Sequence, residues 1–118
     1  MKNFKSIYFE TDSGRRPVEE FINSLQIRTQ NKYFVVVELL EELGKRLPEP
    51  HAKDLGDGIY ELRFSGIEGK VRILYFFYYE NKIIFTNGFV KKTGRIPQNE
   101  LETAKGRRKV YLGRCSKI

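Results

Sequence analysis

The sequence predicts an α+β fold, in which a small, largely antiparallel β-sheet has helices packed on one face. Two observations lead to this prediction. Segments with strand-like and helix-like patterns follow one another in the order β-α-α-β-β-β-α. The chain has 118 residues, of which 40% are hydrophobic, and this suits a single domain over residues 1–118 with its own core.

The first half of the chain contains one predicted strand and two predicted helices. Aromatic and β-branched residues at positions 4–10 indicate the strand. Pro17 suits the first position of a helix, which is expected to end near Leu25. A second helix is expected over residues 29–47, because its apolar side chains recur at the spacing of one buried stripe. This stripe consists of Val36, Leu39, Leu40, Leu43 and Leu47.

The second half contains three predicted strands and a last helix. Residues 48–58 are expected to form a loop, because they contain two prolines and an Asp-Gly turn signal. Short spacers suited to antiparallel hairpins separate the strand candidates, which are residues 59–64, 71–79 and 82–89. The last helix begins near Pro97, and Gly106 and Gly113 weaken its far end. We therefore expect a basic, frayed C-terminal segment over about residues 106–118.

The net charge of +7 is distributed unevenly along the chain. Residues 1–50 and 51–85 are each neutral, whereas residues 86–118 carry nine basic and two acidic side chains. A clustered basic segment is typical of proteins that bind polyanions such as nucleic acid. The alternative is a solvated basic tail that has no specific partner.

The composition disfavours several classes of protein. No apolar run approaches the roughly 18 residues of a membrane span, and residues 1–10 lack the apolar core of a signal peptide. Cys115 is the only cysteine, which excludes an intramolecular disulfide and fits the reducing cytoplasm. Since His51 is the only histidine, a zinc site would need two carboxylates, which is an unusual ligand set, and we expect no metal site. We expect no other cofactor.

Strand alternation predicts the direction in which the charged side chains of the sheet point. Glu61 and Arg63 share one face of their strand, and Arg72 lies on one face of the next. Because the helices must cover the apolar face, we expect these three side chains on the opposite face. Lys91 and Lys92 leave the third strand at the rim of the same sheet.

This charged surface has two interpretations. Arginines and lysines among aromatic side chains suit the binding of phosphate and the stacking of single-stranded bases. Alternatively, Glu61 and Arg63 pair with cross-strand neighbours on a solvated sheet face.

Four short segments carry a more specific pattern. They are residues 53–63 (KDLGDGIYELR), 71–77 (VRILYFF), 87–93 (NGFVKKT) and 96–97 (IP), with Glu100 and Ala104 behind them. In this order and spacing they resemble the phage-derived HigB-like toxins of the RelE/ParE superfamily, over about residues 48–106. The whole chain then corresponds to one RelE/HigB-like toxin domain.

The resemblance implies a toxin of a type II toxin–antitoxin pair that cleaves messenger RNA, typically on translating ribosomes. Such enzymes need no metal, because the RNA 2′-hydroxyl attacks the adjacent phosphate and expels the 5′-oxygen. The implied partners are messenger RNA, the ribosome and a cognate antitoxin with a helix-turn-helix domain. The same fold also hosts ParE-like inhibitors of DNA gyrase, and a nucleic-acid-binding remnant without toxicity is a third alternative.

The resemblance also implies five catalytic residues. Arg63 and Arg72 would clamp the scissile phosphate, while Lys91 and Lys92 would contact phosphate or donate a proton. Glu61 would act either as the base or as the group that orients Arg63. Further RNA contacts are expected from Lys53, Arg95, Lys105, Arg107 and Arg108.

The remaining polar candidates have structural interpretations. Tyr60 alternates away from Arg63 and is expected to lie in the core. Tyr111 is the only tyrosine or histidine after Lys92, so the general acid stays unassigned. We expect turn residues at Asp54 and Asp57, a surface histidine at His51 and an inert thiol at Cys115.

Overall fold

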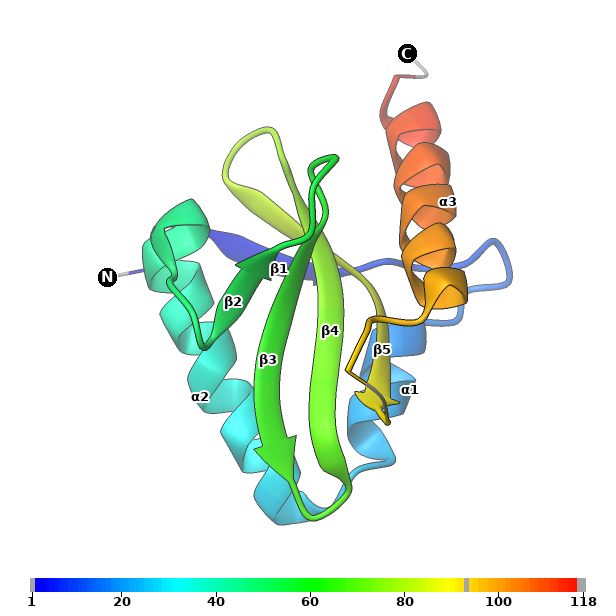
Figure 1. Ribbon diagram of the computed structural model, residues 1–118. Coiled ribbons are helices and arrows are strands. Elements are labelled where there is room, and N and C mark those ends of the chain that lie inside the picture. The colour runs from blue at the N-terminus through cyan, green and yellow to red at the C-terminus, as the bar shows by residue number, and fades with distance from the viewer. Residues whose placement is uncertain (1, 93, 117–118) are drawn as a thin grey trace.

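Five strands form one sheet in the computed structural model, which describes residues 2–92 and 94–116 (Figure 1). They are β1 (Lys5–Tyr8), β2 (Ala52–Asp54), β3 (Tyr60–Gly66), β4 (Gly69–Tyr78) and β5 (Lys82–Lys91). The strands lie in the order β1-β5-β4-β3-β2, with β1 parallel to β5 and the other pairs antiparallel. The predicted α+β fold with a largely antiparallel sheet is confirmed.

Strand β2 lies inside the segment that the sequence predicts as a loop. It pairs with the first half of β3, where Ala52 lies opposite Leu62 and Asp54 opposite Tyr60. A strand of three residues is too short for a periodic signal, and the prolines before it favour a loop prediction. The pairing ends at Leu62, so the rest of the β3 edge extends beyond β2 (Figure 1).

Three α-helices occur among the described residues, and none of them is long and apolar enough to cross a membrane. They are α1 (Pro17–Asn23), α2 (Ile27–Leu43) and α3 (Gln98–Cys115). Helix α1 begins at Pro17, as predicted. Helix α2 begins two residues before the predicted position and ends in a short 3-10 turn, η1 (Gly44–Arg46).

Helix α3 is longer than the sequence predicts. It continues through Gly106 and Gly113 to Cys115, so the expected fraying from residue 106 is not met, while residues 117–118 lie outside the described part. Each glycine costs a helix about 1 kcal/mol relative to alanine. Docking of α3 offsets this cost, because Ala104 is fully buried and the side chain of Arg107 donates to the Thr86 carbonyl at 2.8 Å.

Helices α1 and α2 cover one face of the sheet, whereas α3 covers part of the opposite face (Figure 1). The prediction that all helices pack on one face is therefore wrong. The physical reason is that Leu74, Phe76 and Ile84 on the second face are also apolar and require cover. Residues 101, 104 and 111 of α3 supply it.

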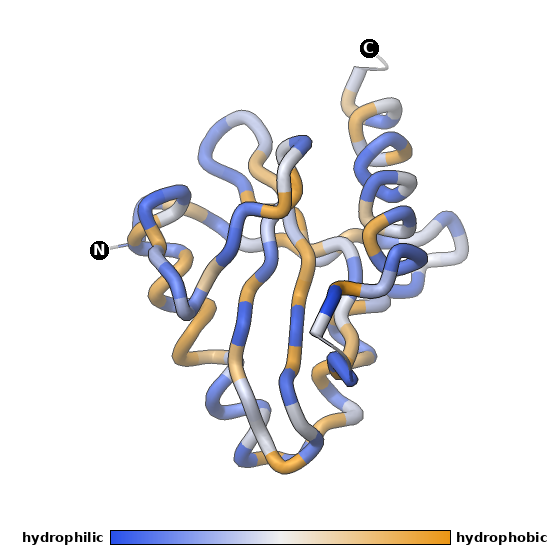
Figure 2. The backbone as a smooth tube through the Cα atoms, viewed as in Figure 1, coloured by the Kyte–Doolittle hydropathy of each residue, from blue (hydrophilic) through white to orange (hydrophobic). Residues whose placement is uncertain are grey.

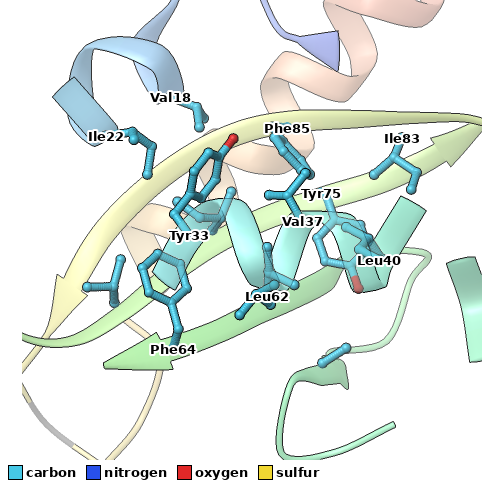
Figure 3. Packing of buried hydrophobic residues seen from close by; sticks show 14 of the residues in the cluster. Val18, Ile22, Tyr33, Val37, Leu40, Leu62, Phe64, Tyr75, Ile83 and Phe85 are labelled. Atoms are coloured by element: carbon cyan, nitrogen blue, oxygen red, sulfur yellow. The ribbon is translucent and has the colours of Figure 1, made fainter. Parts of the chain in front are cut away.

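The face beneath α1 and α2 holds the larger apolar core (Figure 3). Tyr33 and Leu40 of α2 lie in one cluster with Leu62 of β3. Tyr60 packs at the margin of this cluster and stacks on Tyr75 with ring centroids 5.6 Å apart, which confirms that it belongs to the core. Hydrophobic and hydrophilic residues alternate along β3 and the first part of β4 (Figure 2), whereas the second part of β4 is apolar on both faces.

Glu68 in the hairpin between β3 and β4 anchors the N-terminus of α2 to the sheet. Its carboxylate accepts hydrogen bonds from the backbone N–H of Gln26 at 2.6 Å and the hydroxyl of Thr29 at 2.7 Å. These bonds stabilise the charged form and lower the pKa of Glu68. The contact fixes α2 beside the far end of β3.

Candidate functional site

Strand register brings the two predicted arginines together. Arg63 of β3 lies directly opposite Arg72 of β4, and Phe89 of β5 is the next residue in the same row. Lys91 lies two residues beyond Phe89 and therefore on the same face of the sheet. This is the face opposite α1 and α2, as the alternation predicts.

Glu61 connects the two arginines. Its Oε1 lies 3.3 Å from Arg63 Nε, and its Oε2 lies 3.8 Å from Arg72 Nε. The carboxylate is not on a solvated surface, because Glu61 is only 1% exposed and Arg72 only 5%. Burial lowers the pKa of the Arg72 guanidinium, and the neighbouring charge of Glu61 acts in the opposite direction.

The hydrogen bonds of this triad are incomplete. Among the described residues, Glu61 Oε2, Arg63 Nε and Arg72 Nε are buried without a hydrogen-bond partner. The rest of the Arg72 side chain is held firmly, since Nη1 donates to the carbonyls of Val71 at 2.9 Å and Phe64 at 3.4 Å. Buried polar atoms are rarely left unpaired, so the triad is an incompletely satisfied cluster of charges, as is expected at a functional site.

A pocket of about 300 Å³ adjoins the triad and gathers three further predicted residues. Lys53 of β2 lies opposite Glu61, while Lys91 ends β5 and Arg95 follows it. The pocket is lined by Lys53, Leu55, Glu61, Lys91, Gly94, Arg95 and Ile96. Four segments that are distant in sequence thus place cations around one carboxylate.

Lys91 experiences all of these charges. Burial lowers the pKa of its ammonium group, and repulsion from Arg72, Arg63 and Lys53 acts in the same direction, against the attraction of Glu61. A lysine with a lowered pKa releases its proton more readily than an ordinary lysine. Lys91 is therefore suited to proton transfer as well as to phosphate binding.

Lys92 differs from its neighbour. It lies one residue beyond the end of β5, is exposed and does not line the pocket. The two adjacent lysines of the predicted pair therefore occupy different environments, and only Lys91 joins the triad.

The predicted RNA-binding residues of α3 contact the protein itself. Lys105 lies 3.6 Å and Arg108 3.3 Å from the Asp57 carboxylate. Arg107 donates to the Thr86 carbonyl, and burial lowers the pKa of its guanidinium. None of these three cations lines the 300 Å³ pocket.

Asp57 lies in a turn as predicted, whereas Asp54 is the last residue of β2 and its side chain caps the turn that follows. Asp54 Oδ1 accepts a hydrogen bond from the Gly56 N–H at 2.8 Å, and Asp57 has a positive φ of 56°, as is typical of turns. Tyr111 packs edge-on against Phe76, with ring centroids 5.8 Å apart, and lies in the second apolar cluster instead of the cationic pocket.

A larger groove was not predicted. It has a volume of about 610 Å³ and is lined by Arg63 and Arg72 together with residues of α2, including Val35. His51, which is half-buried, also lines it, and the His51 carbonyl accepts the Arg63 N–H at 2.8 Å. The sequence signal that indicates this groove is Val35 itself, an apolar residue outside the buried stripe of α2.

A family model described as "Phage derived protein Gp49-like (DUF891)" matches residues 20–109. The chain belongs to this Gp49-like family. The match covers the whole cationic cluster, from Lys53 to Arg95, as well as α2 and most of α3. No curated protein matches the chain in a sequence search. The Gp49-like family is a toxin-like family of the RelE/HigB class, and membership implies a toxin that pairs with an antitoxin.

Proposed function

We propose that this Gp49-like protein is a HigB-like endoribonuclease toxin that cleaves messenger RNA on translating ribosomes in the cytoplasm. The observation that carries the proposal is the buried pair of Arg63 and Arg72, which share the single carboxylate of Glu61. Two guanidinium groups beside a cationic pocket suit the charge of a phosphate in its transition state. A cognate antitoxin with a helix-turn-helix domain is the proposed partner.

The proposed reaction begins at the ribose. The 2′-hydroxyl attacks the adjacent phosphorus and gives up its proton, and the bond from phosphorus to the 5′-oxygen breaks. Glu61 lines the pocket, and we assign its carboxylate as the acceptor of the 2′-hydroxyl proton. The Oε1 atom meanwhile holds Arg63 in place.

Lys91 is the proposed donor of a proton to the departing 5′-oxygen. Its lowered pKa and its place at the pocket rim support this role. The products are a 2′,3′-cyclic phosphate and a free 5′-hydroxyl, so atoms and charges balance without a further reactant. Residues 2–92 and 94–116 contain no group of three or more His, Cys, Asp or Glu side chains that suits a metal.

Other cations are assigned to the flanking RNA. Lys53 and Arg95 line the pocket and are placed to bind the neighbouring phosphates. Lys92, Lys105, Arg107 and Arg108 lie outside the pocket lining, so we propose a smaller contribution for them to RNA docking.

Cleavage of a defined transcript by the purified chain tests the proposal. We expect cleavage in the presence of EDTA, and a loss of at least about 100-fold for Arg63→Ala and for Arg72→Ala. Arg28→Ala, which removes an exposed arginine of α2, is the matched control and should cleave normally. Full cleavage by both site variants would disprove the assignment, as would inhibited DNA supercoiling by a chain that leaves transcripts intact.

A further inference from the structure

The 610 Å³ groove is lined by residues of β3 beyond the part that pairs with β2. Helix α2 forms one wall, β3 forms the other, and the residues before β2 close one end. A volume of this size is within the range of roughly 300–1,000 Å³ that is typical of small-molecule sites. The catalytic proposal does not use this space.

The walls of the groove are apolar and its margin is polar. Val35 of α2 is 62% exposed although it is apolar, and Phe64 of β3 contributes to the same groove. Asn31, His51 and Ser65 bring side-chain amide, imidazole and hydroxyl groups to the lining. An occupant with apolar faces and a hydrogen-bonding edge would fit this lining, and a nucleobase has this character.

The groove and the phosphate site share residues. Arg63 and Arg72 line the groove, and the same two arginines contact Glu61, which lines the cationic pocket. Their two positive charges therefore lie where the groove and the pocket meet. A single nucleotide can therefore satisfy both parts of the surface, with its phosphate at the arginines and its base in the groove. An apolar peptide segment would bring no anion to these two guanidinium groups.

We propose that the groove is the subsite for the base of the nucleotide that carries the scissile phosphate. Val35 and Phe64 contact the faces of the base, and Asn31, His51 and Ser65 read its edge. His51 is held in register with the arginines, because its carbonyl accepts the Arg63 N–H. This inference rests on the proposed function, and it adds that the selectivity of cleavage originates at the edge of β3.

Binding without cleavage tests the subsite. The probes are a trinucleotide with 2′-O-methyl groups throughout, which the proposed reaction cannot cut, and an abasic trinucleotide with the same phosphates. We expect both probes to shift the backbone amide signals of Arg63 and Lys91 in an NMR titration of the full chain. Only the probe with bases should shift those of Val35, His51 and Ser65. Identical shifts from the two probes would overturn the proposal.

Two variants isolate the contribution of the base. Val35→Asp and Phe34→Asp add the same charge at neighbouring exposed positions of α2, but Phe34 does not line the groove. We expect Val35→Asp to weaken binding of the base-containing probe about tenfold more than Phe34→Asp does, since a stacked base contributes roughly 5- to 150-fold in affinity. The two variants should bind the abasic probe equally, and circular dichroism confirms their folding.

The design separates the subsite from the nuclease. If the difference between the variants is found but transcripts stay intact, the nuclease assignment fails and base binding in the groove stands. If transcripts are cleaved but the two variants bind and cleave alike, the nuclease stands and the subsite is wrong.

Discussion

Strand β4 passes through two regions of one sheet face that are built in different ways. Leu74 and Phe76 are packed beneath α3 in an apolar cluster with Ala104. Arg72 lies two residues earlier on the same side of the strand and is 5% exposed, yet its neighbours are Arg63 and Glu61. The same strand thus buries hydrocarbon at one end and charge at the other.

The difference shows where stability and function are located. Burial of apolar side chains under α3 stabilises the fold. Burying charged groups costs solvation energy. The ion pairs between Glu61 and the two arginines offset this cost only in part, because three of their polar atoms have no hydrogen-bond partner. Departures of this kind from good packing are expected at functional sites. The apolar region therefore stabilises the sheet, and the sheet in turn positions the charged side chains.

Phe76→Ala should have the largest effect on stability. Phe76 is 3% exposed and contacts the Tyr111 ring, so its truncation leaves a cavity beneath α3. We expect the free energy of unfolding to fall by about 3–5 kcal/mol. Urea denaturation followed by circular dichroism measures this loss. A cost below that of a surface substitution would show that α3 is not a structural part of this face.

Arg72→Met should have the opposite result, with a large effect on RNA cleavage and a small effect on stability. The substitution removes one of two arginines and leaves Glu61 paired with Arg63, so no buried charge loses its only partner. We expect transcript cleavage to fall by about 100-fold or more, with a much smaller loss of unfolding free energy than in Phe76→Ala, because only the hydrogen bonds to the Val71 and Phe64 carbonyls are lost. A variant that cleaves poorly because it is unstable would contradict the contrast between the two regions.

Substitution of two glycines allows the tightly packed face of the sheet to be compared with the exposed side of α3. A Cβ atom at Gly88 of β5 would lie 2.5 Å from a ring carbon of Phe21, whereas a Cβ at Gly106 of α3 would meet nothing within 4 Å. We expect Gly88→Ala to destabilise the protein by about 1–3 kcal/mol. Gly106→Ala should stabilise it by about 0.5–1 kcal/mol. Thermal unfolding of both variants measures these two changes. Equal effects on stability would contradict the predicted difference between the two positions.

The carboxylate of Glu41 is well hydrogen-bonded, whereas that of Glu61 has an oxygen without a hydrogen-bond partner. Burial alone would raise the pKa of Glu41, but hydrogen bonds from the Ser6 hydroxyl at 2.7 Å, from Lys2 and from the Ser6 N–H outweigh it and lower the pKa. A lowered folded-state pKa stabilises the protein above the unfolded pKa, and this stability is lost as the pH falls through the folded value.

We therefore expect the unfolding free energy to decline below about pH 4.5 by roughly 1 kcal/mol through Glu41. Glu41→Gln should remove this part of the pH dependence and have little effect near pH 3. Urea titrations at pH 7 and pH 3 measure the difference. An unchanged pH profile in the variant would show that these hydrogen bonds do not stabilise the fold.

The sheet face was predictable from the sequence because strand alternation has a fixed period. Glu61, Arg63 and Arg72 could be placed together from their positions in two strands, and the register confirms that placement. The location of α3 could not be predicted in this way, because a helix with few apolar residues has no strong preference for either face. The groove depends on how far β2 extends along β3, which is a property of pairing that local sequence does not encode.

The arginines that fasten α3 have a consequence for binding to a charged polymer. Arg108 contacts Asp57, Arg107 contacts the Thr86 carbonyl, and Arg114 contacts Asp12 at 2.7 Å. Cations that are already paired within the protein displace few counterions from RNA. For single strands, the logarithm of affinity falls against the logarithm of salt concentration with a slope of about −0.7 per neutralised phosphate. All nine basic residues of the C-terminal third would give a slope of about −6, and each of them that is held within the protein makes the slope less steep. The salt sensitivity of this protein should therefore be that of a small, defined contact, despite a net charge of +7.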